Sequence, residues 1–238
     1  MKRFLIVFIA CLLPVMLIGA DRNNNAVNLT ALKAMAMRGE DCTGYLGWYV
    51  YDDGSITEYD RPGTIGIIAY IGNQAVDVSL PDCRILVLSK VDLMNNGGMV
   101  SFLWNRKYDA GSSYGGEGLD GYQNTRRLYE SESHPRIGWE TAGWMCWNLG
   151  DGISGRNATH WFLPTMGQWE LMTGVSGVGS GDSLTLSRST GMSFGSGNHA
   201  GYWSSTQQGG NALFLNRSLG GIAFSTYNYL KVRAVFAF

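Results

Sequence analysis

The stretch Lys231-Val232-Arg233-Ala234-Val235-Phe236-Ala237-Phe238 decides how this chain folds. Apolar residues that favour strands dominate the stretch, and no polar tail follows it in the sequence. Left in water, such a run would form an exposed hydrophobic edge that pairs with other chains. The pattern therefore predicts a buried final strand at Tyr229–Phe236.

A second ordered stretch, Tyr202-Trp203-Ser204-Ser205-Thr206, precedes this run. Between the two lies Gln207–Asn228, which is rich in Gln, Gly, Asn and Ser and poor in acidic residues. Alternation of apolar and polar residues predicts further strands at Ala212–Asn216 and Gly221–Ser225. A polar surface held between fixed strands is a common arrangement in binding modules.

The overall composition describes a globular, weakly charged chain. Its 238 residues are 45% hydrophobic and 16% charged, with a formal net charge of -1. The length suits one large domain or two small ones, and the hydrophobic content excludes a disordered chain. Nucleic-acid binding is excluded as well, because it needs a clustered basic surface. The 33 glycines and low charge indicate β structure with long loops.

The N-terminal residues have the pattern of an export signal. Lys2 and Arg3 precede the apolar run Phe4–Ile18, and small residues follow before Asp21. The run is short for a membrane span and contains Pro14, so a cleaved signal at residues 1–20 is favoured over an anchor. This predicts a secreted or cell-surface protein whose only membrane contact is through the signal. Residues 21–44 are predicted to form a linker or peripheral segment, and residues 45–238 the folded domain.

Removal of the signal leaves Cys42, Cys83 and Cys146. An odd number of cysteines permits at most one disulfide, and no pair has the spacing of zinc ligands. Two interpretations of these cysteines remain open: they are buried as small apolar side chains, or two of them form one incidental disulfide.

The first half of the domain is predicted to supply antiparallel strands at Gly47–Tyr51, Thr64–Ile71 and Arg84–Ser89. Turn residues at Asp52–Ser55 follow the first of these strands. Short helices are predicted at residues 125–133 and 140–148.

A further helix is predicted to begin after Thr165, because Gln168 three residues later completes a capping box. The segment Trp161–Thr165 is expected to be a strand that leads into this helix. The aromatic residues around Trp144 and Trp147 allow either a ligand groove or core filling, of which core filling is the commoner explanation.

No catalytic or metal-binding pattern is present. His134, His160 and His199 lack partners at metal-ligand spacing, and the acidic residues lack the regular order of a calcium loop. The sequence therefore predicts no catalytic residue, no metal and no cofactor. His160 is expected to pack at the start of a strand.

Three segments in this order, Trp161–Leu171, Tyr202–Thr206 and Val232–Phe238, resemble secreted proteins of gut Bacteroides-type bacteria. Those proteins have the C-type-lectin-like fold that is shared with formylglycine-generating enzymes. The resemblance is strongest to the variable proteins of diversity-generating retroelements. It implies an α+β, C-type-lectin-like fold with mostly short antiparallel strands, about two short helices and long Gly-rich loops.

The resemblance further implies that the Trp-Ser-Ser and Val-Arg-Ala-Val segments are scaffold, and that polar residues between them form a ligand surface. Alternation along Asn211–Asn216 also indicates that one face of this strand displays a row of side chains. The resulting candidate ligand-binding residues are Gln207, Gln208, Asn211, Leu213, Leu215, Arg217, Tyr227, Asn228 and Tyr229. An ordinary polar surface without a partner remains the alternative.

The function that this pattern favours is a secreted, non-catalytic binding protein for a protein or glycan ligand on a cell or phage surface. The alternative is a structural subunit of a surface appendage or envelope assembly. A formylglycine-generating enzyme is the least favoured, because such enzymes use cysteines near the C-terminus and this chain has none after Cys146.

Overall fold

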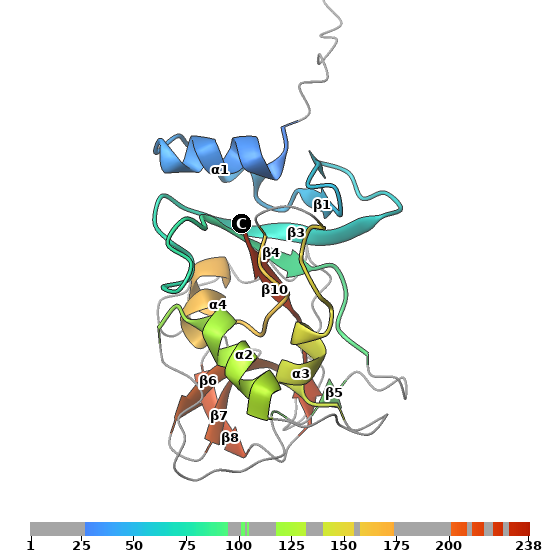
Figure 1. Cartoon of the computed structure of the whole chain (residues 1–238), viewed down its shortest axis with the longest axis vertical. Helices are drawn as coiled ribbons and strands as arrows, with labels where there is room; N and C mark the ends of the chain where they lie inside the picture. The colour runs from blue at the N-terminus through green and yellow to red at the C-terminus, as the bar shows by residue number, and fades with distance from the viewer. Residues whose placement is uncertain are drawn as a thin grey trace, which may run out of the picture.

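The structure is a computed structural model, in whose described residues ten strands form two five-stranded sheets and short helices pack around them (Figure 1). The residues it describes are 27–94, 101–102, 104, 118–131, 140–154, 158–173, 201–208, 211–216, 221–225 and 229–238. Nearly all strand pairs are antiparallel, so the chain has an α+β fold, as the sequence predicts. The predicted signal at residues 1–20 lies outside the described residues.

The first sheet has the strand order β10-β4-β3-β1-β2. Its strands are β1 (Tyr49–Tyr51), β2 (Ile56–Thr57), β3 (Thr64–Ile71), β4 (Ile85–Ser89) and β10 (Val235–Ala237). The strands predicted in the first half of the domain are therefore confirmed. The turn between β1 and β2 is also confirmed, since Gly54 has a φ of 80° and the Asp53 carboxylate accepts a bond from the Ser55 amide at 2.8 Å.

The second sheet has the order β5-β9-β6-β7-β8. Its strands are β5 (Ser101–Phe102), β6 (Gly201–Gln208), β7 (Asn211–Asn216), β8 (Gly221–Ser225) and β9 (Leu230–Lys231). In Figure 1 the two sheets lie toward opposite ends of the molecule, and helices occupy the space between them. These helices are α2 (Gly121–Ser131), α3 (Ala142–Trp147) and α4 (Met166–Thr173).

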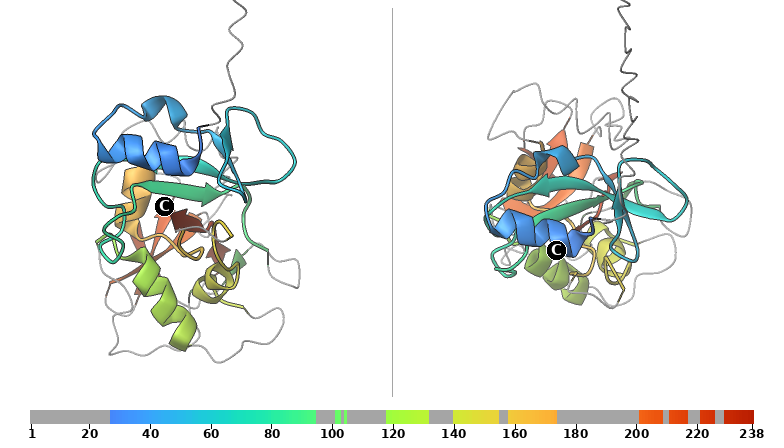
Figure 2. Two further views of the ribbon diagram at one scale, coloured as in Figure 1. Left: turned by 45° about the horizontal axis from the view of Figure 1, so that its top comes forward. Right: turned by 90° about the horizontal axis from the view of Figure 1, so that it is seen from above.

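Helix α1 (Leu29–Met37) lies across the first sheet, on the side away from the second (Figures 1 and 2). Asn28 caps the helix, because its side chain accepts a bond from the Ala31 amide at 3.0 Å. Leu29 and Leu32 are fully buried against the sheet, and burial of each contributes on the order of 1.5–3 kcal/mol. The described part of the predicted linker, which also contains the short 3₁₀ helix η1 (Thr43–Tyr45), therefore belongs to the folded domain.

Strand β4 is buried on both faces, which explains its continuous apolar sequence. Ile85 and Val87 belong to the same apolar cluster as the buried leucines of α1. Leu86 and Leu88 point the other way and pack in a second cluster with Trp169 of α4. Both clusters also reach the second sheet, since Phe214 of β7 belongs to the first cluster and Leu215 of the same strand to the second.

The C-terminal run is buried, as predicted, but it is not one strand. Leu230–Lys231 pairs in the second sheet as β9, and Val235–Ala237 pairs with β4 in the first sheet as β10. The three residues between them cross from one sheet to the other. The outer edge of β10 is covered, because Phe162 and Val235 exchange two backbone hydrogen bonds of 2.7 and 2.9 Å.

The predicted capping box of α4 is confirmed. The Gln168 amide donates to the Thr165 hydroxyl, and the Thr165 amide donates to the Gln168 side-chain oxygen, each at 3.0 Å. The prediction of a strand at Trp161–Thr165 is wrong, since only isolated bridges occur in this region, at His160 and Phe162. The other two predicted helices are confirmed with shifted ends, as α2 and α3.

The three cysteines of the described chain are free thiols, so their interpretation as buried apolar side chains is confirmed. Burial raises the pKa of Cys42, of Cys83 and, most strongly, of Cys146. These thiols therefore remain protonated at neutral pH.

Candidate functional site

The candidate surface is built on β6, whose segment Tyr202–Thr206 is completely buried. We call these five residues the anchored segment. The pairing of β6 with β7 is interrupted between Trp203 and Gln207, which frees the carbonyl groups of the segment from the regular ladder. The indole of Trp104 donates to the Ser204 carbonyl at 2.7 Å, and the indole of Trp169 donates to the Trp203 carbonyl at 3.4 Å.

The anchored segment also holds the start of α4. The Met166 amide, in the first turn of that helix, donates to the Thr206 hydroxyl at 3.0 Å. One residue earlier in β6, the Ser205 amide donates to the Pro164 carbonyl at 2.8 Å. The anchored segment thus has the contacts of a scaffold, in agreement with the role that the resemblance implies for it.

A buried ion pair ties the second sheet to the strand crossing. Arg233 is 2% exposed, and its Nε lies 2.8 Å from Asp92 Oδ1. Its Nη1 donates to the carbonyls of Ser89 and Lys90, both at 2.9 Å. The Asp92 carboxylate also accepts a bond from the Tyr202 hydroxyl at 3.2 Å. Breaking a buried ion pair is costly because one charge is then left without its partner, so this contact fixes the two sheets relative to each other.

Burial ends abruptly where β6 turns into β7. Gln207 is half-buried, and Gln208 and Asn211 are exposed and pair directly with each other across the two strands. We call these three residues the hairpin end. Their amide side chains offer both donors and acceptors to a partner, and they carry no charge.

The prediction that Leu213 and Leu215 are exposed ligand-binding residues is wrong. Leu213 is 9% exposed and Leu215 is 1% exposed, and both pack in the apolar cluster of α4. Ala212 and Phe214, on the opposite face of β7, are buried in the cluster that includes α1. Because both faces of the strand are covered, neither displays a row of side chains.

Tyr229 is 45% exposed, as predicted, but it lies apart from the hairpin end. Strand β9 runs parallel to β6 with Lys231 beside Tyr202, so Tyr229 is near the beginning of β6. Since Tyr229 is level with about residue 200, the seven or eight residues to Gln207 and Gln208 place the hairpin end roughly 25 Å away from it, at about 3.3 Å per residue. The remaining candidates Arg217, Tyr227 and Asn228 lie outside the described residues.

A buried carboxylate that the sequence did not single out organises the other helices. Asp77 is fully buried and accepts bonds from the Ser79 amide at 3.0 Å, the Tyr122 amide at 3.0 Å and the Gln168 side chain at 3.1 Å. It thereby caps the start of α2 and joins it to the capping box of α4. Burial raises the pKa of Asp77, and these hydrogen bonds oppose the rise. Its place between Val76 and Val78 was the available sequence signal.

Side chains that could be metal ligands are scattered in the part of the chain that the structure describes. Within it, no three His, Cys, Asp or Glu side chains gather closely enough to hold a metal ion. His160 lies at an isolated bridge with Asp151 and not at the start of a strand, and its Nε2 lies 3.1 Å from Asp151 Oδ1. Among the described helices, none is long and apolar enough to span a membrane.

The chain's relation to known proteins rests on its fold. The sequence matches no protein-family model and no curated protein. Its structure is similar to the crystal structure of a fimbrial protein from Bacteroides ovatus, with a TM-score of 0.51 and 18% sequence identity. The similarity covers 81% of this chain and 48% of the fimbrial protein, so the chain spans about half the length of that protein. At this identity the likeness concerns the fold alone.

Proposed function

We propose that this chain is an exported structural subunit of a cell-surface appendage or envelope assembly in a Bacteroides-type bacterium. The observation that carries the proposal is the fold shared with a fimbrial protein over 81% of the chain. The apolar run that follows Lys2 and Arg3 supports export.

The internal construction suits such a role. A subunit that transmits load needs parts that do not slide past one another, and the Arg233–Asp92 pair fastens the two sheets at their crossing. The surface also carries large apolar side chains that are available for contacts between subunits. Val78 is 71% exposed, Tyr59 is 65% exposed and Val91 is 63% exposed.

Crosslinking in living cells tests this proposal. A photoreactive amino acid is placed at Tyr59, Val78 or Tyr229 in turn, and at buried Val50 as the matched control. If the chain is an assembly subunit, at least one exposed position yields a ladder of integer multiples of the subunit mass, and Val50 yields none. Monomer bands at all three exposed positions contradict the proposal. Deletion of residues 21–37 would be a poor test of assembly, because it also removes the leucines of α1 that are buried against the first sheet.

A second candidate is a non-catalytic binding protein with a C-type-lectin-like fold that recognises a protein or glycan. The exposed hairpin end on the anchored segment favours it, because a rigid support reduces the entropy lost on binding. Neither candidate requires a cofactor or a catalytic residue.

Two observations test this second candidate. Replacing Gln208 and Asn211 together by Ala must reduce binding to an identified ligand while the fold is kept. A near-copy of the DNA that encodes residues 201–238, differing at adenines and lying beside a reverse-transcriptase gene, would support a diversified surface. If neither is found, the hairpin end is an ordinary turn.

A further inference from the structure

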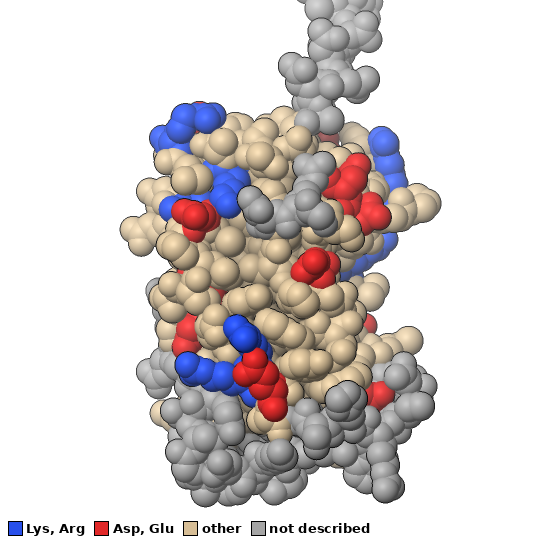
Figure 3. Space-filling view, viewed as in Figure 1, with Lys and Arg blue, Asp and Glu red and all other residues tan. Residues whose placement is uncertain are grey.

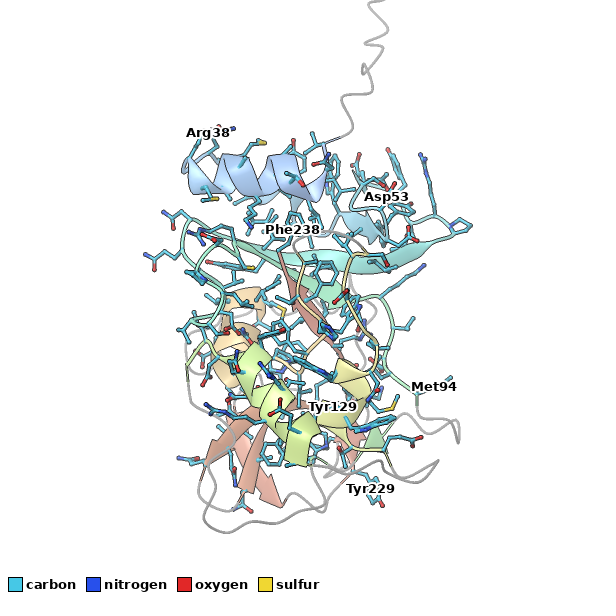
Figure 4. The ribbon with its side chains drawn as sticks, in the orientation of Figure 1. Arg38, Asp53, Met94, Tyr129, Tyr229 and Phe238 are labelled. Carbon is cyan, nitrogen blue, oxygen red and sulfur yellow. The ribbon has the colours of Figure 1, made fainter. Side chains whose placement is uncertain are left out.

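Four half-buried rings meet on the surface between α2 and α3. Trp147, the last residue of α3, is the centre of this group. Its ring centroid lies 4.8 Å from that of His160, 5.2 Å from that of Tyr122 and 6.0 Å from that of Tyr129. We call these four residues the ring cluster. In Figure 4, Tyr129 lies in the space between α2 and α3.

The backbone around the ring cluster is fixed. Tyr122 and Tyr129 are seven residues apart on α2, so they share one face of the helix. His160 is held in a short antiparallel contact, in which the Trp161 amide donates to the Gly150 carbonyl at 2.9 Å and the Gly152 amide donates to the Thr159 carbonyl at 2.8 Å. The rings are therefore positioned before any partner binds, which lowers the entropy cost of binding.

Exposed polar groups border the rings on two sides. His160 Nε2 and Asp151 Oδ1 are 3.1 Å apart, and their side chains are 38% and 54% exposed. On α2, Arg126 and Glu130 form an exposed pair at 2.8 Å. Both Arg126 and Asp151 influence the Tyr122 hydroxyl, whose pKa is raised mainly by burial. In Figure 3, a broad uncharged area of this face lies beside a few acidic and basic side chains.

The aromatic rings and the polar groups beside them together match the chemistry of a sugar. A sugar ring has one face of C–H groups, which packs on aromatic surface, and a rim of hydroxyls, which binds planar polar side chains. Trp147 stacks on both His160 and Tyr129, so the parts of the half-buried rings that stay exposed provide the first, and Asp151 with His160 provides the second. Four half-buried rings leave only a few hundred Å² of aromatic surface, far below the roughly 800 Å² that each partner buries in a stable protein complex.

We propose that the ring cluster is a binding site for a neutral saccharide, in which Trp147 and Tyr129 contact the sugar ring and Asp151 and His160 bind its hydroxyls. The site goes beyond the proposed structural role and does not depend on it. It lies on α2, α3 and the bridge between Asp151 and His160, and not on the hairpin end that was predicted to bind ligands.

Tryptophan fluorescence and calorimetric titration test the site, with chitotriose, mannotriose and xylotriose as probes. We expect at least one trisaccharide to bind, and Asp151→Ala to weaken it about tenfold or more, because a charged hydrogen-bond partner is lost. Asp151 is exposed, so this variant keeps the fold. Trp147→Leu should abolish binding, and Tyr129→Ala replaces it if the Leu variant does not fold.

The control is Gln208→Ala on the hairpin end, which should bind the same trisaccharide unchanged. Failure of all three trisaccharides to bind at millimolar concentration overturns the inference. Full binding by Asp151→Ala and Tyr129→Ala overturns it as well. If assembly uses other surfaces, Asp151→Ala leaves the crosslinking ladder intact. Failure of the saccharide site can therefore be distinguished from failure of the assembly proposal.

Discussion

Strand β6 contains two regions that differ sharply although they are adjacent. The anchored segment, Tyr202–Thr206, is completely buried, and its backbone forms hydrogen bonds with the indoles of Trp104 and Trp169 and with the Pro164 carbonyl. The hairpin end begins at the next residue, and Gln208 and Asn211 are exposed. A change of sequence at the hairpin end thus alters the surface, whereas a change in the anchored segment alters the fold.

The largest predicted effect comes from breaking the ion pair that holds the anchored segment to the strand crossing. Arg233→Met should lower the free energy of unfolding by about 3 kcal/mol, because the mostly buried Asp92 loses its shortest ion pair and keeps only the 3.3 Å contact with Lys231. Urea denaturation measures the loss. The matched control is Arg126→Met, which removes an exposed ion pair and should leave the free energy of unfolding nearly unchanged. Equal losses in the two variants would contradict the structural role of Arg233.

A smaller effect is predicted for the contact between the anchored segment and α4. Thr206→Val keeps the volume but removes the hydroxyl that accepts from the Met166 amide, so a buried donor is left unpaired. We expect a loss of about 1–2 kcal/mol. Thr30→Val, at an exposed position of α1, should stay within about 0.5 kcal/mol of the parent protein. An unchanged unfolding free energy in Thr206→Val would show that the Met166 amide does not depend on the Thr206 hydroxyl.

A pH effect is predicted for Asp77, which joins α2 to the capping box of α4. Its pKa is raised in the folded protein, so the folded state binds a proton more readily than the unfolded chain. The contribution to stability is therefore present at acidic pH and is lost as pH rises from the ordinary aspartate range through the raised pKa. Asp77→Asn cannot titrate and should lack this part of the pH dependence, although it is less stable overall because its amide meets other donors.

Denaturation of both proteins between about pH 3 and pH 7 provides the measurement. The difference in unfolding free energy between parent and variant should shrink as pH rises. Parallel curves would mean that Asp77 has an ordinary pKa in the folded protein.

The smallest effect on stability is predicted at the hairpin end. Gln208→Ala combined with Asn211→Ala should change the free energy of unfolding by less than about 0.5 kcal/mol, since neither residue is buried. Thermal unfolding measures this. A loss comparable to that of Thr206→Val would erase the distinction between the two regions of β6.

Local features were predictable from the sequence, but the elements with which each strand and side chain pairs in the fold were not. The strand Thr64–Ile71 was predicted with its observed ends, because its apolar run is bounded by turn residues. The capping box of Thr165 and Gln168 is equally local and was also confirmed. The prediction that the C-terminal run forms one strand was wrong, because a strand pattern does not indicate which sheet its residues join.

The candidate site shows the same limit of prediction. Alternation along β7 predicts two distinct faces, but it cannot show that helices and the other sheet cover both of them. Leu213 and Leu215 were therefore assigned to the surface although they are core residues. The Arg233–Asp92 pair was missed since its residues are far apart in the sequence and only the fold brings them together.

Immunogold electron microscopy of producing cells tests the proposed role most directly. An epitope inserted between the exposed residues Asp52 and Asp53, in the β1–β2 turn, leaves both sheets intact. The account predicts gold particles on surface structures of intact cells, and recovery of the tagged chain in a high-mass fraction after shearing. Tagged chain found only as free monomer in the medium, or only inside the cells, would contradict it.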